Sequence, residues 1–146
     1  MTEVKFYEPS FIPEAGLTYS VIAAKFGEKW VFVRHHRRST WEIPGGHIEE
    51  NETSYDAAER ELREETGAAD FVLECVSTYS VKKGKKTGYG RLYLAKVLKM
   101  GPLQDKSEIK EIKIDSFIAE ENTYPDIQPL LFERILMYIK TRGEIL

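Results

Sequence analysis

The chain has 146 residues, 42% of them hydrophobic and 31% charged, with a formal net charge of −3. This length suits one domain, residues 1–146, and the acidic balance gives no general attraction to nucleic acid or to an anionic membrane. A single cysteine, Cys75, excludes an internal disulfide, and we find neither a secretory signal nor a membrane-length apolar run. We therefore expect a cytoplasmic protein with no stable nucleic-acid partner and no membrane contact.

The first third of the chain predicts a hairpin followed by a loop. The N-terminal segment is polar and contains Pro9 and Pro13. Residues 17–26 are rich in β-branched and aromatic side chains, which favours a strand, and residues 29–34 form the second arm of a hairpin. A short extended piece then starts at Trp41, and the Pro-Gly-Gly run over 44–46 ends it.

The next segment predicts a helix with defined ends. Thr53 is placed as its N-cap, and Asp56 three residues later resembles the second half of a capping box. Gly67 is placed for the left-handed residue that closes a helix. Between them, alanines and a leucine form a small apolar stripe beside a row of glutamates.

The second half predicts two strands, a third strand and a last helix. The strands cover residues 71–81 and 89–98, joined by a Lys/Gly loop with its turn at 87–90. Residues 109–114 alternate apolar with charged side chains, as a half-buried strand does. Residues 127–141 have apolar side chains at helical spacing and should pack on a sheet. The sequence thus predicts one mixed α and β unit.

Three carboxylates of the first helix point to a metal site. Glu61, Glu64 and Glu65 project from adjoining helix positions and repel one another unless a positive charge lies between them. Hard divalent cations such as Mg²⁺ and Mn²⁺ prefer such oxygens. Arg60 is expected to point about 100° away from Glu61 on the helix and could pair with Glu52.

Two features near this helix fit a phosphate-bearing ligand. Gly45 and Gly46 leave the backbone bare, so that a main-chain group can approach a metal ion or a phosphate. The basic runs Arg34–Arg38 and Lys82–Lys86 are either solvated loops or attract a polyanionic small molecule. The histidines at 35, 36 and 47 are not spaced as a zinc site. His47, close to the two glycines, either faces the phosphates or is an exposed loop residue.

The spacing of these residues resembles a known signature. Gly46 is followed by five residues, then Glu52, then seven residues, and then the run Arg60-Glu-Leu-Arg-Glu-Glu-Thr-Gly67. This resembles the Nudix box of the Nudix hydrolase superfamily. One position departs, because Ala68 stands where the box closes on a larger aliphatic residue, which should soften packing and leave the chemistry intact.

The resemblance implies an α+β fold, a mixed β-sheet sandwiched between α-helices (α/β/α), with the box as a loop–helix–loop. It implies hydrolysis of a nucleoside diphosphate linked to another group, X, with Mg²⁺ or Mn²⁺ as cofactor. The metal ligands implied are Glu61, Glu64 and Glu65, with the Gly45 carbonyl as a further ligand.

The resemblance also implies supporting and catalytic roles. Glu52 and Arg60 would be supporting or metal-linked residues, and Glu64 is a candidate for the catalytic base. A further acidic residue outside the box often contributes in the family, and Glu108 and Glu111 are the candidates by position.

Substrate choice is less explicit. The run Trp41–Gly46 resembles the segment before the box in MutT-like members, which remove oxidised nucleotides such as 8-oxo-dGTP. Asn122 could read a purine, since such members use an asparagine before the last helix, although a polar loop is the alternative. Tyr79 could stack on a base. Gly46 and Arg34 complete the predicted substrate-binding set.

Two alternatives stay open at this point. The domain could act on another substrate of the superfamily, such as a dinucleoside polyphosphate, a nucleotide sugar or an RNA 5′ end. It could also be a nucleotide-sensing domain without catalysis, although such domains often lose the metal-binding glutamates that are present here. A homodimer is also possible.

Overall fold

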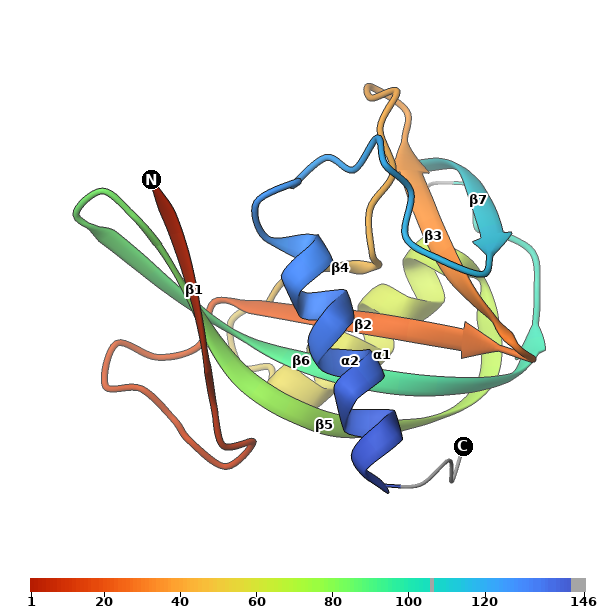
Figure 1. Cartoon of the computed structure of the whole chain (residues 1–146). Helices are drawn as coiled ribbons and strands as arrows, with labels where there is room; N and C mark the ends of the chain where they lie inside the picture. Colours follow the sequence, from red (N-terminus) through yellow and green to blue (C-terminus); the bar gives the residue numbers. More distant parts are fainter. Residues whose placement is uncertain (106, 143–146) are drawn as a thin grey trace.

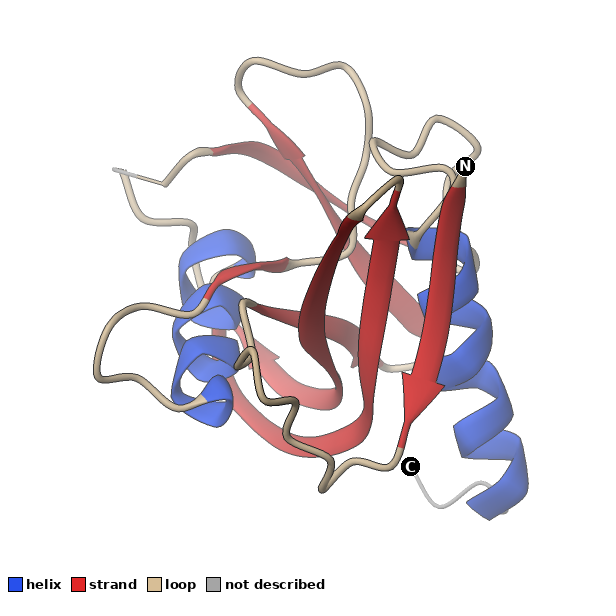
Figure 2. Cartoon of the chain, turned by 90° about the vertical axis from the view of Figure 1, so that its left-hand side faces the viewer, coloured by secondary structure: helices blue, strands red, loops and turns tan. Residues whose placement is uncertain are grey.

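The computed structural model describes residues 1–105 and 107–142, and these residues form one sheet with a helix on each face. Figure 2 shows the two helices on opposite sides of the strands. The elements in chain order are β1 (Thr2–Tyr7), β2 (Tyr19–Phe26), β3 (Lys29–His35), β4 (Gly45–His47), α1 (Ser54–Thr66), β5 (Ala68–Lys83), β6 (Lys86–Met100), β7 (Ile109–Asp115) and α2 (Gln128–Arg142).

The sheet is mixed, and two different strands, β4 and β3, pair with the two halves of β2. Its described strands run in the order β1-β5-β6-β2-β3-β7, with β4 as a side branch on β2. β2 is parallel to β6, and the other pairs are antiparallel. The first half of β2 pairs with β4, as Val21 with Gly45, and its second half pairs with β3, as Ala24 with Val31. The glycines of β4 therefore lie at a break in the sheet.

Alternation along β2 divides the core into two layers. Val21 and Ala23 belong to the cluster that contains α2, whereas Ile22 and Ala24 belong to the cluster that contains Leu62 of α1. Successive strand residues point to opposite faces, so a strand that is buried on both faces must be apolar throughout. The predicted sheet between helices is confirmed, with α2 in front of the sheet and α1 behind it in Figure 1.

Helix α1 begins and ends where its sequence signals predict. The Thr53 hydroxyl accepts a hydrogen bond from the Asp56 amide at 3.0 Å, and the Asp56 carboxylate accepts one from the Thr53 amide. Gly67 closes the helix with φ at 78°, and a Cβ there would lie 2.5 Å from the Gly101 carbonyl oxygen. These caps fix which helix residues face the sheet.

The N-terminal strand and the position of one turn differ from the prediction. The sequence predicts no element before Pro9, yet β1 pairs along its whole length with the far end of β5. The β5–β6 turn lies at Gly84, with φ at 60°, and its hairpin extends away from the body of the molecule in Figure 1. Gly90, predicted at the turn, lies within β6, where the Tyr79 ring occupies the place of a side chain: a Cβ added to Gly90 would lie 2.7 Å from that ring.

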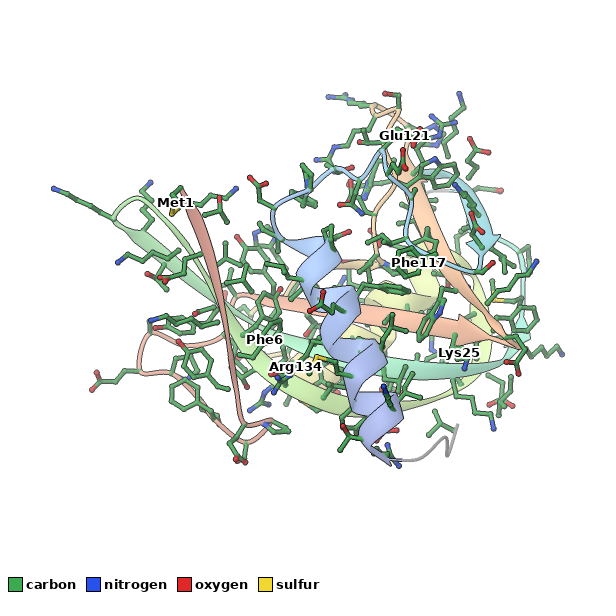
Figure 3. The ribbon with its side chains drawn as sticks, in the orientation of Figure 1. Met1, Phe6, Lys25, Phe117, Glu121 and Arg134 are labelled. Atoms are coloured by element: carbon green, nitrogen blue, oxygen red, sulfur yellow. The ribbon has the colours of Figure 1, made fainter. Side chains whose placement is uncertain are left out.

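Helix α2 covers one face of the sheet, where it packs against side chains of β1. It starts within one residue of its predicted position. The Arg134 guanidinium lies over the Phe6 ring of β1, 5.0 Å from its centroid, and Figure 3 shows the two side chains together. Phe117, from the segment after β7, packs edge-on against Phe132 of α2. Neither helix in the described part of the chain has both the length and the apolar character needed to cross a membrane.

Candidate active site

Two glutamates on successive turns of α1 face the glycines of β4. The Gly45 amide donates a hydrogen bond to Glu65 Oε1 at 3.0 Å. A Cβ added to Gly46 would lie 1.6 Å from Glu61 Oε2, so a residue with a side chain at position 46 would overlap this carboxylate. Both acids therefore lie directly against the glycine backbone of β4.

Both carboxylates are harder to ionise than a glutamate in water. Burial raises the pKa of Glu61 to about 7, with Arg60, whose Nη1 lies 3.6 Å from Glu61 Oε1, opposing the effect and repulsion from Glu64 adding to it. Burial likewise raises the pKa of Glu65 to about 8, the Gly45 hydrogen bond opposing and Glu61 adding to it. Two largely enclosed carboxylates whose negative charge is only partly balanced suit a hard cation such as Mg²⁺ or Mn²⁺.

Glu64 stands apart from this pair. Its side chain is 46% exposed and accepts a hydrogen bond from Arg60 Nη1 at 3.0 Å. Within residues 1–105 and 107–142, no three His, Cys, Asp or Glu side chains are grouped closely enough to hold a metal ion. The structure thus brings together two of the three predicted ligands, Glu61 and Glu65. The third, Glu64, is hydrogen-bonded to Arg60 instead.

Arg60 connects the helix to the loop that precedes it. It does not point away from the acids as the helical wheel predicts, because its long side chain folds back over them. Nε and Nη2 donate to the two carboxylate oxygens of Glu52 at 2.7 and 3.0 Å, and Nη2 also donates to the His47 carbonyl. These hydrogen bonds lower the pKa of Glu52 to about 2. The predicted Glu52–Arg60 pair forms, and it ties the loop over residues 47–52 to α1.

A cluster of polar side chains around the buried Glu42 lies beside the pair and is not among the predicted site residues. His35 Nε2 lies 3.4 Å from Glu42 Oε1 and 3.6 Å from Glu65 Oε2. Arg38 donates to the other oxygen of Glu42, which is only 6% exposed. Burial opposes ionisation of Glu42, but the hydrogen bonds from His35 and Arg38 hold its pKa below the usual range. The sequence alone carries no signal that position 35 meets positions 42 and 65.

The predicted substrate-binding residues outside the box have other contacts in this structure. Arg34 donates to the Glu111 carboxylate and to the Arg38 carbonyl. Tyr79 is 3% exposed within the core, which leaves its ring no free face for a base.

Asn122 is also occupied by contacts within the protein. Its amide nitrogen donates to Gln128 at 3.1 Å, and its oxygen accepts from the Tyr124 amide at 2.8 Å. Gln128 in turn accepts a hydrogen bond from the Ile43 amide. This chain of contacts joins the start of α2 to the extended piece before the glycines.

The two acidic candidates outside the box differ in position. Glu111 is paired with Arg34. Glu108 lies close enough to Glu61 to contribute to its raised pKa, as does Glu49 from the loop before the helix. The geometry therefore favours Glu108 over Glu111 as the additional acid beside the helix pair.

The fold and the site together define a class of protein. It is an α/β/α sandwich in which a loop–helix–loop, running from Gly46 through Glu52 to Gly67, places its acids against a glycine strand. A model of the NUDIX domain matches residues 16–131, which is most of the chain. The chain belongs to the Nudix family.

Curated relatives match over part of their length. The chain is 35% identical over 89 residues to the Bacillus subtilis protein named "Putative 8-oxo-dGTP diphosphatase YtkD", covering 61% of this chain and 56% of that protein. It is 35% identical over 77 residues to an RNA pyrophosphohydrolase of a Sulfurovum species, covering 50% of this chain and 49% of that protein. The chain thus spans about half the length of these two relatives.

Solved structures support the same fold. A crystal structure of a mutant of the Bacillus subtilis pyrophosphohydrolase BsRppH superposes with a TM-score of 0.78 at 25% identity, over 99% of this chain and 93% of that chain. A UDP-X diphosphatase superposes with a TM-score of 0.73 at 18% identity, over 92% of this chain and 68% of that chain.

Proposed function

We propose that residues 1–146 form one Nudix domain that hydrolyses a nucleoside diphosphate linked to X with the help of Mg²⁺ or Mn²⁺. The substrate we propose is a nucleoside triphosphate, normal or oxidised, cleaved to the monophosphate and pyrophosphate. The observation that carries the proposal is the pair of buried carboxylates, Glu61 and Glu65, held against Gly45 and Gly46. Two neighbouring carboxylates of this kind suit a divalent cation. A cation bound there would lie next to the glycine backbone, which a phosphate group can approach closely.

Each residue of the box has a role in this proposal. Glu61 and Glu65 hold the metal, with the Gly45 carbonyl as a further ligand. Glu64 is the remaining metal ligand and the proposed base, because its exposed carboxylate is free to turn from Arg60 towards a ligand. Arg60 keeps Glu52 ionised and fixes the loop that follows Gly46.

Mg²⁺, when bound, would neutralise phosphate charge and activate water for attack on phosphorus. The protein's own residues then do two things. Glu64 accepts a proton from the attacking water, a role for which a partly exposed carboxylate near the phosphates is suited. The glycine strand leaves room for the phosphate chain beside the two buried acids.

An RNA 5′ end is a second candidate substrate. One relative is named an RNA pyrophosphohydrolase, and the β5–β6 hairpin carries the basic run Lys82–Lys86 at its projecting turn. A projecting cationic turn suits a longer polyanion better than it suits a free nucleotide. The triphosphate cleavage is the same in both cases.

A substrate screen tests the proposal. Phosphate or pyrophosphate release would be measured with dGTP, 8-oxo-dGTP, 5′-triphosphorylated RNA, ADP-ribose and a diadenosine polyphosphate, each with and without Mg²⁺. We expect Mg²⁺-dependent release of a monophosphate product from a triphosphate substrate. No hydrolysis of any of these compounds, together with a ligand-induced thermal shift, would favour a sensing domain instead.

The Glu64→Gln variant is the sharpest mutational test. It keeps the shape of the side chain and removes its ability to accept a proton, so we expect turnover to fall by roughly 10²–10⁴-fold. Because the side chain is on the surface, the melting temperature should change little. Glu59→Gln on the same helix is the matched control and should retain full turnover. Unchanged hydrolysis by the purified Glu64→Gln protein would rule out the role as base.

A further inference from the structure

The side chain of His35 faces helix α1 through the ordinary alternation of strand β3. His35 is the last residue of β3, and Val31, four residues earlier in the same strand, packs in the layer that contains Leu62 of α1. Residues two and four apart in a strand point to the same face, so His35 is on the α1 side of the sheet. The register between β3 and β7 shifts at this point, which leaves one residue of β7 without a partner in the ladder. The imidazole lies close to Glu65 of α1.

The imidazole lies between two buried carboxylates from different parts of the chain. Nε2 is 3.4 Å from Glu42 Oε1 and 3.6 Å from Glu65 Oε2. Glu42 is itself fixed, because its other oxygen accepts from Arg38 and its backbone pairs with Val33. The histidine therefore contacts a buried acid whose backbone is paired with β3 and whose other oxygen is hydrogen-bonded.

Each oxygen of Glu65 has a polar neighbour, one hydrogen-bonded and one at ion-pair distance. Oε1 accepts a hydrogen bond from the Gly45 amide, and Oε2 faces the His35 ring. Its side chain is 9% exposed, so little water competes for these positions. Groups that contact a metal-binding carboxylate from behind set its orientation, and removing them commonly weakens metal binding by roughly 10–100-fold.

We propose that His35 is a positioning residue for Glu65: held by Glu42, its imidazole keeps the Glu65 carboxylate turned towards the Gly45–Gly46 strand. The inference rests on the proposed function, because it takes Glu65 as a metal ligand. It adds to the box a residue from β3, a strand that lies outside it. His35, Glu42 and Arg38 thus contact the site from residues that precede the box in the chain.

Binding of Mn²⁺ in the absence of substrate tests this proposal. The free ion would be followed by electron paramagnetic resonance at pH 8 for the wild type and for His35→Ala, His35→Asn and His35→Gln. We expect the Mn²⁺ dissociation constant to rise roughly 10-fold in His35→Ala and His35→Asn, which cannot reach Glu65. His35→Gln carries an amide donor on a longer side chain and should restore binding to within about threefold of the wild type.

The matched control is His36→Ala, because His36 is exposed and directly adjacent in the chain. It should bind Mn²⁺ as the wild type does. Circular dichroism would establish that each variant is folded, and the asparagine and glutamine variants keep the comparison available should the alanine variant not fold.

Activity separates a positioning role from a direct one. In His35→Asn, the Mg²⁺ concentration for half-maximal rate should rise roughly 10-fold, and kcat at saturating Mg²⁺ should approach the wild-type value. Unchanged or tighter Mn²⁺ binding in both His35→Ala and His35→Asn would overturn the proposal, as would a loss of kcat that saturating Mg²⁺ does not restore. Absence of Mn²⁺ binding by the wild type would instead refute the proposed metal-dependent function.

Discussion

The acid in the loop before helix α1 and the two acids of the helix that face β4 have their negative charge balanced in different ways. Glu52, in the loop before the helix, is paired with Arg60 and has its pKa lowered to about 2. Glu61 and Glu65, facing β4, are buried and have their pKa values raised to about 7 and about 8. Arg60 thus satisfies Glu52 with two hydrogen bonds, whereas Glu61 and Glu65 have ion-pair contacts at the longer distance of 3.6 Å, from Arg60 and His35.

This difference separates a structural ion pair from a ligand site. An arginine that satisfies a carboxylate fixes a loop and needs nothing further. Carboxylates that burial makes harder to ionise and that no arginine hydrogen-bonds cost stability when they ionise, and a bound cation removes that cost. The following predictions test the contrast, beginning with the largest expected effect.

Replacing Glu65 with glutamine should damage activity most. The variant loses a charged oxygen ligand, worth several kcal/mol to a metal-assisted step, so we expect kcat/KM to fall by roughly 10³-fold. The stabilisation of the fold by Mg²⁺, seen as a rise in melting temperature of the wild type, should disappear. A variant with normal kcat/KM and a normal Mg²⁺ response would show that Glu65 is not a ligand.

The same variant should be more stable than the wild type when metal is absent. The Glu65 pKa is raised in the folded state, so the unfolded chain loses its proton first and wild-type stability falls as pH rises from about 4.5 to about 8. Glutamine does not titrate, so its advantage should grow over this range to about 1–3 kcal/mol. Melting temperatures in EDTA at pH 5 and pH 8.5 would measure it, and a Glu65→Gln protein less stable than the wild type at pH 8.5 would contradict it.

Gly46→Ala should displace Glu61. The new methyl group would overlap the carboxylate, and misplacing a group at a reactive centre by about 1 Å can lower the rate roughly 10²-fold. Gly88→Ala is the matched control, because a Cβ there meets only the Tyr19 ring, at 3.6 Å. Steady-state kinetics and Mg²⁺ titrations would compare the two. Equal activity in both variants would mean that Glu61 is not needed in this position.

Arg60→Lys should have the smallest effect of the series. Lysine keeps the charge but cannot contact both oxygens of Glu52, so we expect a lower melting temperature and a fall of roughly 10-fold in kcat. Arg63→Lys, in which the arginine donates to the Ala69 carbonyl and lies over the Phe71 ring, removes no carboxylate contact and should cost less stability than Arg60→Lys. Thermal unfolding and kinetics of the pair would measure the difference; equal stability would argue against the Glu52–Arg60 pair as the anchor of the loop.

The local part of this structure could be predicted from the sequence. Thr53, Asp56 and Gly67 define the ends of α1 by contacts within a few residues of each other, and all three are found in their predicted roles. The Glu52–Arg60 pair is also close in the chain. Features set by neighbouring residues, such as caps and periodicity, need no knowledge of the rest of the fold.

The parts that depend on distant contacts could not be predicted. β1 becomes a strand because the end of β5 offers it an edge, and Gly90 is a glycine because the Tyr79 ring packs on it. Alternation along β3 puts His35 on the face that carries α1, but its contact with Glu65 depends on how β3 and α1 pack together. Each of these depends on residues that lie far apart in the sequence.

The central claim is that Glu61 and Glu65 bind a divalent cation against the glycines of β4. Crystals grown with Mn²⁺ and measured for anomalous scattering test it most directly. We predict an anomalous peak within coordination distance of both carboxylates and of the Gly45 carbonyl oxygen. A protein that binds Mn²⁺ elsewhere, or that shows no peak at saturating Mn²⁺ while these carboxylates remain in their present positions, would contradict the claim.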